Sequence, residues 1–132
     1  MTTPPTVLVV DDDATLRRAI ESALTQEGYR VVGTGAAETA YELLASLKPD
    51  AMLLDIRLPT MSGLALYLAI INRWPALVGR IAIMTGDVEG DEARAWLRRN
   101  PCAVLRKPFH RRAVLEWLRG VLQAPKLEQG NG

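Results

Sequence analysis

Short apolar runs alternate with amphipathic segments along the chain. Five of these runs are too brief for helices and rich in branched aliphatic residues, which is typical of buried strands. The predicted strands are Thr6 to Val10, Tyr29 to Val32, Ala51 to Leu54, Arg80 to Met84 and Ala103 to Leu105. Each run is followed by a segment with apolar residues at helical spacing, so the pattern predicts five strand-helix repeats.

Such repeats restrict the fold. Parallel strands need a crossover connection, usually a helix, so the repeats predict a parallel sheet with helices on both faces. We expect an α/β fold of the doubly wound, flavodoxin-like (βα)5 type. This fold is a three-layer sandwich whose five-stranded sheet has the strand order 2-1-3-4-5.

The predicted helices have recognisable ends. Asp13 is a suitable N-cap for the first helix, Gly28 a suitable residue to end it, and Lys48-Pro49 stops the second. The third and fourth helices are predicted from about Gly63 to Asn72 and from about Glu89 to Arg99. The apolar residues of the first, second and fifth helices span Leu16 to Leu24, Ala37 to Leu47 and Val114 to Val121. The third helix is apolar on every side, so part of it is expected to be exposed.

Polar residues stand at the carboxyl ends of the predicted strands. Asp11 and Asp12 follow the first strand, Asp55 the third, Thr85 the fourth and Lys107 the fifth. Each has an ordinary explanation alone, as a turn residue, a strand-end hydroxyl or a solvated charge. Parallel strands end at one edge of a sheet, however, so these side chains should converge on one rim, where open α/β sheets bind ligands.

The predicted rim suits phosphoryl chemistry. Clustered carboxylates repel one another and lose solvation, so a hard divalent cation is expected to neutralise them. Mg2+ prefers oxygen ligands, which Asp12, Asp55 and a phosphoryl group could supply. A carboxylate held there can attack phosphorus to form an aspartyl phosphate. Lys107 and the Thr85 hydroxyl are placed to bind the remaining phosphoryl oxygens.

Composition narrows the class of protein further. With 132 residues, 48% hydrophobic residues and a net charge of +1, the sequence is typical of a single globular domain, with a core from about residue 6 to 123 and a frayed tail over 124–132. The net charge by itself favours neither nucleic acid binding nor membrane binding, and the longest apolar run, Leu64 to Ile71, is too short to cross a bilayer. Cys102 is the only cysteine and the N-terminus lacks the blocks of a signal peptide, so we expect a cytoplasmic protein.

Four motifs, in this order and spacing, resemble those of a known family. They are VLVVDDD, DIRLPTMSGL, MTGD and RKPF, at residues 7–13, 55–64, 84–87 and 106–109. From Val7 to Leu122 the chain resembles the response-regulator receiver domains of two-component signalling.

The resemblance implies a phosphorelay role. Asp55 would receive a phosphoryl group from a histidine kinase or a phosphotransfer protein. Asp11, Asp12 and the main-chain carbonyl of Arg57 would bind Mg2+ together with Asp55. The Lys107-Pro108 bond resembles the cis peptide of the family. Receivers are signalling domains rather than enzymes, with at most slow self-catalysed phosphorylation and dephosphorylation.

The sequence departs from the family at two places. Receivers usually have Tyr or Phe three residues before the lysine, where this chain has Val104, so the usual aromatic switch is absent. We expect Thr85 and the loop from Gly86 to Gly90 to carry the response instead. Arg57 and Asp87 could also meet across the mouth of the site, or could simply be solvated.

Other functions fit less well. A flavin carrier would need a hydroxyl-rich or glycine-rich loop after the first strand, where three aspartates would repel phosphate. An aspartate-nucleophile phosphatase generally needs a second acid where this chain has Arg57, so any turnover should be slow. The last third of the chain is rich in arginine but contains no helix-turn-helix, so direct nucleic acid binding is not expected.

The sequence also leads to hypotheses about the output surface and about whether the receiver stands alone or belongs to a longer chain. The output surface is predicted on the fourth helix, fifth strand and last helix, whose arginines would suit an acidic protein partner. A homodimer through that face would oppose arginines, and the alternative surface is the third helix, with exposed Leu66 or Ile70. Met1 favours a free-standing receiver, whereas the segment from Met84 to Phe109 resembles receivers excised from hybrid histidine kinases.

Overall fold

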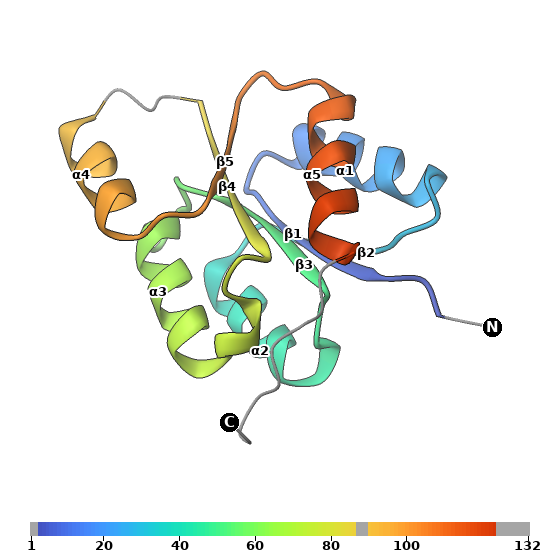
Figure 1. Ribbon diagram of the computed structural model, residues 1–132, viewed down its shortest axis with the longest axis horizontal. Coiled ribbons are helices and arrows are strands. Elements are labelled where there is room, and N and C mark those ends of the chain that lie inside the picture. The colour runs from blue at the N-terminus through green and yellow to red at the C-terminus, as the bar shows by residue number, and fades with distance from the viewer. Residues whose placement is uncertain (1–2, 87–89, 124–132) are drawn as a thin grey trace.

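The computed structural model describes residues 3–86 and 90–123 (Figure 1). Its strands are β1 (Thr6–Val10), β2 (Arg30–Thr34), β3 (Ala51–Asp55), β4 (Ile81–Thr85) and β5 (Ala103–Arg106). They form one parallel sheet in the order β2-β1-β3-β4-β5. The α/β fold and the strand order predicted from the sequence are therefore confirmed.

Helices cover both faces of this sheet. They are α1 (Ala14–Gln26), α2 (Ala37–Leu47), α3 (Gly63–Arg73), α4 (Asp91–Arg99) and α5 (Arg111–Gln123), with a short 3-10 helix, η1 (Pro75–Leu77), after α3. In Figure 1, α1 and α5 lie on one side of the sheet and α2, α3 and α4 on the other. Within the described residues, no helix has the length and apolar character required to cross a membrane.

Alternate residues of the strands pack into two apolar cores, one on each face of the sheet. Val7, Val9 and Leu53 face the core shared with α1 and α5, where Ile20, Leu24 and Leu118 are buried. Leu8, Val10, Met52 and Leu54 face the other core, which contains Leu44, Leu66 and Ile70 from α2 and α3. Because β1, β3 and β4 are buried on both faces, their sequences are continuously apolar.

Several element boundaries differ from the predicted ones. β2 begins one residue later than expected and continues to Thr34, because it pairs in register with β1 until Val10 lies opposite Thr34. This pairing carries the strand through Gly33, a residue that propensity alone disfavours in a strand. α4 begins at Asp91, and the predicted start at Glu89 lies outside the described residues.

The predicted exposure of Leu66 and Ile70 on α3 is wrong. Leu66 is 1% exposed and Ile70 0%, and both pack in the core formed with α2. With Gly63 and Tyr67 they form a buried stripe at helical spacing, so the uniformly apolar sequence concealed a normal inward face. Leu68, on the outer face, is 40% exposed instead.

α4 is attached to the body of the domain differently from the other helices. None of its residues is buried. The indole of Trp96 packs edge-on against the ring of Tyr67 on α3, with ring centroids 5.3 Å apart. An aromatic contact therefore joins α4 to the core beneath it.

A close backbone contact joins the end of β3 to the start of α3. The Gly63 N–H donates a hydrogen bond of 2.8 Å to the Ile56 carbonyl. A Cβ atom at position 63 would overlap the main-chain carbonyl oxygen of Asp55. Glycine at this position therefore lets α3 begin directly against the residue that ends β3.

Candidate functional site

Three carboxylates lie together at the carboxyl edge of the sheet. Because β1 and β3 are paired with Val10 opposite Leu54, the residues that follow them are neighbours. Oxygen atoms of Asp11, Asp12 and Asp55 lie within 4.8 Å of one another. Asp11 and Asp55 are buried, at 0% and 5% exposure, whereas Asp12 is exposed at the rim. The structure thus brings together the three acids that strand order predicted to converge.

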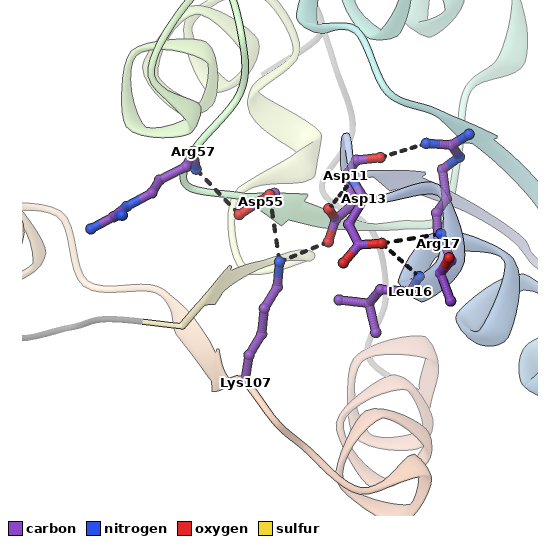
Figure 2. A network of polar contacts seen from close by, with 8 residues as sticks. Asp11, Asp13, Leu16, Arg17, Asp55, Arg57 and Lys107 are labelled. Carbon is purple, nitrogen blue, oxygen red and sulfur yellow. Dashed lines mark hydrogen bonds and ion pairs between the residues drawn. The ribbon is translucent and has the colours of Figure 1, made fainter.

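The three consecutive acids after β1 have different environments and different hydrogen bonds. The Asp13 N–H donates to Asp11 Oδ1 at 2.9 Å, which fixes the buried carboxylate. The Asp13 carboxylate accepts hydrogen bonds of 3.1 Å from the Thr15 and Leu16 N–H groups and so caps α1 (Figure 2). The predicted role of Asp13 as N-cap is confirmed, which leaves Asp11 and Asp12 to the cluster.

Lys107 brings a positive charge into the cluster from the loop after β5. Its Nζ atom lies 2.9 Å from Asp11 Oδ2 and 3.5 Å from Asp55 Oδ2 (Figure 2). Burial lowers the pKa of this ammonium, but contact with Asp11 and the charges of Asp11 and Asp55 outweigh burial, and the net change in pKa is upward. Lys107 therefore remains charged. Its main-chain N–H donates separately to the Thr85 carbonyl at 2.7 Å.

The peptide bond between Lys107 and Pro108 is cis, as the resemblance implied.

Thr85 ends β4 and is 1% exposed. It pairs with Arg106 in the register of β4 and β5, next to Lys107. Thr85 thus ends the strand next to β3, and Lys107 directly follows β5, so both lie at the carboxyl edge of the sheet with the carboxylates.

The surroundings of Asp55 perturb the protonation of its carboxyl group. Burial raises the pKa of its carboxyl group to about 6, and the negative charge of Asp11 adds to the increase. The Arg57 N–H, which donates to Asp55 Oδ1 at 3.2 Å, and the charge of Lys107 act in the opposite direction. The ionised form of Asp55 is therefore costly in the absence of a cation at the site.

This cost predicts a pH dependence of stability. Because the folded chain holds the Asp55 proton more tightly than the unfolded chain does, stability should fall as pH rises from about 4 to about 6. Asp55→Asn removes the ionisation, so it should raise the free energy of unfolding by about 1–3 kcal/mol above about pH 7 and by little near pH 4. Urea unfolding at both pH values, without divalent cations, measures the difference. Glu42→Gln, which changes an exposed carboxylate, is the control. An equal gain in the free energy of unfolding from Asp55→Asn at both pH values would contradict the raised pKa of Asp55.

The cluster has the properties of a cation site. Asp11 Oδ2 is buried and accepts no directed hydrogen bond from the described residues, although the Lys107 ammonium is close. A buried carboxylate oxygen normally has such partners, and a metal ion can replace them. The all-oxygen set of Asp11, Asp12 and Asp55, one of them open to water, fits a hard cation such as Mg2+ better than zinc.

The remaining predicted residues have mixed outcomes. The Arg57 N–H contacts Asp55, while the Arg57 side chain extends away from the carboxylate (Figure 2). Its proposed partner Asp87 lies outside the described residues, as do residues 88 and 89 of the predicted switch loop. Val104 is half-buried on β5 opposite Ile83, so no ring occupies that position.

Arg17 is a neighbour of the site that spacing did not reveal. Its Nη1 donates to the main-chain carbonyl oxygen of Asp11 at 2.7 Å. An arginine one turn into a helix is ordinarily a surface residue, so the motif around Asp11 to Asp13 gave no reason to single it out. The available signal was the pair of glycines at the neighbouring strand, Gly33 within β2 and Gly35 just after it.

Comparison with known proteins places this geometry in a family. Residues 7–119 match the response regulator receiver domain model. The chain is 39% identical over 103 residues to the DNA-binding transcriptional regulator NtrC of Escherichia coli, covering 78% of this chain and 22% of NtrC. It is 32% identical over 122 residues to the response regulator MprA of Mycobacterium ulcerans, covering 92% of this chain and 52% of MprA. The chain therefore spans about a fifth of the one relative and about half of the other.

Solved structures agree with this assignment. A CheY-like receiver domain protein from Methanospirillum hungatei superposes with a TM-score of 0.83 at 25% identity, covering 91% of this chain and 94% of that one. The receiver domain of NtrX from Brucella abortus gives a TM-score of 0.80 at 26% identity, covering 90% and 99%. Together with the match over residues 7–119, these similarities show that the chain belongs to the response regulator receiver domain family, whose members are phosphoacceptors of two-component signalling.

Proposed function

We propose that Asp55 is the phosphoacceptor of this receiver and that Mg2+ assists the transfer. The observation that carries the proposal is the position of Asp55, a buried carboxylate at the end of the central strand with Lys107 Nζ 3.5 Å from its Oδ2. One carboxylate oxygen of Asp55 forms a bond to phosphorus, and the bond between phosphorus and the donor atom breaks, its electron pair leaving with the donor.

The other residues of the site have supporting roles in this proposal. Asp11, Asp12, Asp55 and the main-chain carbonyl of Arg57 hold the Mg2+, which supplies positive charge to the phosphoryl oxygens when bound. Lys107, now paired with Asp11 and Asp55, binds a phosphoryl oxygen as its contact with Asp55 is released. The Thr85 hydroxyl donates to another phosphoryl oxygen from the end of β4.

The phosphoryl donor is a histidine kinase or a phosphotransfer protein, the proteins with which receiver domains of response regulators interact. We propose that hydrolysis of the product is slow and that the protein is not an enzyme in its own right. The residue two positions after Asp55 is Arg57, which cannot act as the general base that an aspartate-nucleophile phosphatase uses.

The output surface is proposed on α4, β5 and α5. Arg98, Arg99, Arg106 and Arg112 are exposed there, and the arginines suit an acidic protein partner better than a second copy of the same face. Two other arginines of α5 are already paired, because Arg111 and Arg119 lie 2.9 and 3.7 Å from Glu27, the C-cap residue of α1. The change at Thr85 reaches this face through the connection between β4 and α4.

Acetyl phosphate tests the metal-dependent chemistry directly. With Mg2+ it should add one phosphoryl group, seen by intact mass, and chelation of the metal should prevent the addition. Asp12→Ala should raise the Mg2+ concentration needed for half-maximal labelling by roughly tenfold or more, because it removes a metal ligand. Asp13→Asn should leave it unchanged, since asparagine is also a good cap. Metal-independent labelling, or a larger effect of the Asp13 variant, would contradict the proposed ligand set.

A further inference from the structure

Arg17 makes an unusual set of contacts behind the carboxylate cluster. Its side chain is 20% exposed and runs from α1 toward the carboxyl end of β1. Nη1 donates to the Asp11 carbonyl at 2.7 Å, and Nε lies 3.5 Å from Glu21 Oε2 one turn further along the helix. In Figure 2, Arg17 and Lys107 approach Asp11 from different sides.

Two glycines provide the space for this side chain. A Cβ atom on Gly33 would lie 3.2 Å from Arg17 Cδ and would overlap the Glu21 carboxylate, and one on Gly35 would lie 3.1 Å from Arg17 Nη1. Neither glycine has a positive φ, so the backbone does not demand glycine at either position. The demand is for room, because the side chains of Arg17 and Glu21 occupy the volume that other residues would fill.

The accepting oxygen belongs to the peptide bond that joins Asp11 to Asp12. This peptide links the residue with the buried carboxylate, Asp11, to the residue with the exposed one, Asp12. Its orientation therefore sets the direction in which the Asp12 side chain points. The Asp11 N–H already donates to the Thr34 carbonyl at 3.1 Å, and the Asp13 N–H donates to Asp11 Oδ1. The charged donor on the Asp11 carbonyl adds a third and stronger restraint to the turn.

We propose that Arg17 is a positioning residue for the cation site. It holds the Asp11-Asp12 peptide so that both carboxylates face the same point, and Gly33 and Gly35 keep its path open. It contacts neither the cation nor the phosphoryl group and acts through the Asp11 carbonyl. The inference rests on the proposed function, because it assumes that Asp11, Asp12 and Asp55 bind Mg2+.

The test is a titration of the 15N-labelled protein with magnesium chloride, followed through the amide signals of Asp12 and Asp55. Arg17→Ala should raise the Kd for Mg2+ by about tenfold or more, as loss of a residue that orients metal ligands commonly does. Arg18→Ala is the matched control, because Arg18 is exposed on the same helix and its loss changes the net charge equally. It should change the Kd less than about twofold, since exposed charges are screened by salt.

Two further variants separate positioning from charge and from folding. Arg17→Lys keeps the charge but loses the planar fork, so it should recover only part of the affinity. Gly35→Ala keeps Arg17 but places a Cβ 3.1 Å from its Nη1, so the guanidinium must shift by a few tenths of an ångström, and the Kd should rise in the same direction. Labelling by acetyl phosphate should need more Mg2+ in both variants and reach the wild-type rate at saturating Mg2+.

The results distinguish the two levels of the proposal. A wild-type Kd in a folded Arg17→Ala protein, or equal effects of Arg17→Ala and Arg18→Ala, would refute the role of Arg17. If Arg17→Ala does not fold, a wild-type Kd in a folded Arg17→Met protein, which keeps the apolar stem but has no hydrogen-bond donor, would refute the role of Arg17. An absence of Mg2+-dependent shifts at Asp12 and Asp55 in the wild-type protein would instead refute the proposed metal site.

Discussion

The Asp55→Asn protein is expected to take up no phosphoryl group from acetyl phosphate and Mg2+ under conditions that add one group to the wild-type protein. The asparagine amide has nearly the shape of the carboxylate but is a poor nucleophile toward phosphorus, so the loss should exceed about a hundredfold in rate. Intact mass spectrometry before and after incubation measures the uptake.

Controls for this experiment lie within the same cluster. Asp13→Asn, which keeps the cap of α1, should be labelled like the wild-type protein. Lys107→Ala should be labelled more slowly, because it removes the ammonium 3.5 Å from Asp55. Labelling of Asp55→Asn equal to that of the wild-type protein would show that the acceptor is another residue.

Gly63→Ala should be among the most destabilising small substitutions in the chain. The new Cβ would overlap the main-chain oxygen of Asp55, and it would lie 2.8 Å from the Ile56 Cα, so backbone on one side of the contact must move. We expect the free energy of unfolding to fall by about 2–4 kcal/mol, the range of severe overpacking. Urea denaturation with a constant m-value measures the loss.

Gly120→Ala is the matched control for this substitution. Gly120 lies within α5, and nothing is within 4 Å of its added Cβ. Alanine should therefore stabilise the helix by about 0.5–1 kcal/mol, because it restricts the unfolded chain and favours the helical conformation. Similar changes at positions 63 and 120 would mean that the contact between α3 and β3 is looser than described.

The sequence predicted the five strands because each could be recognised from its own residues, and the strand order followed as the common choice for a doubly wound sheet. The apolar runs of β1, β3 and β4 and the cap at Asp13 are local patterns with few alternatives. The inward face of α3 was not predictable in the same way, because a helix without polar residues does not indicate which side is buried. Only its packing with α2 and the sheet settles the burial of Leu66 and Ile70.

The same distinction applies to the site. Convergence of Asp11, Asp12 and Asp55 followed from the parallel sheet, because all three stand at strand ends. The contact of Arg17 with the Asp11 carbonyl depends on empty volume beside Gly33 and Gly35. The sequence around Arg17 does not show that these glycines lie next to it. Contacts created by the absence of a side chain on a neighbouring strand need the fold before they can be recognised.

The aromatic contact between Trp96 and Tyr67 has a consequence for local opening. A helix with no buried residue has little apolar area to lose when it leaves the body of the domain, so α4 should detach at a far lower free energy than the sheet unfolds. Its amide protons should then exchange with solvent well before those of β1 and β3. The indole of Trp96 would leave the ring of Tyr67 in that same event. With Trp74 and Trp117 replaced by phenylalanine, the fluorescence of Trp96 and the exchange of the α4 amides would therefore report one equilibrium. A signal arriving at the end of β4 could bias this equilibrium with little energy.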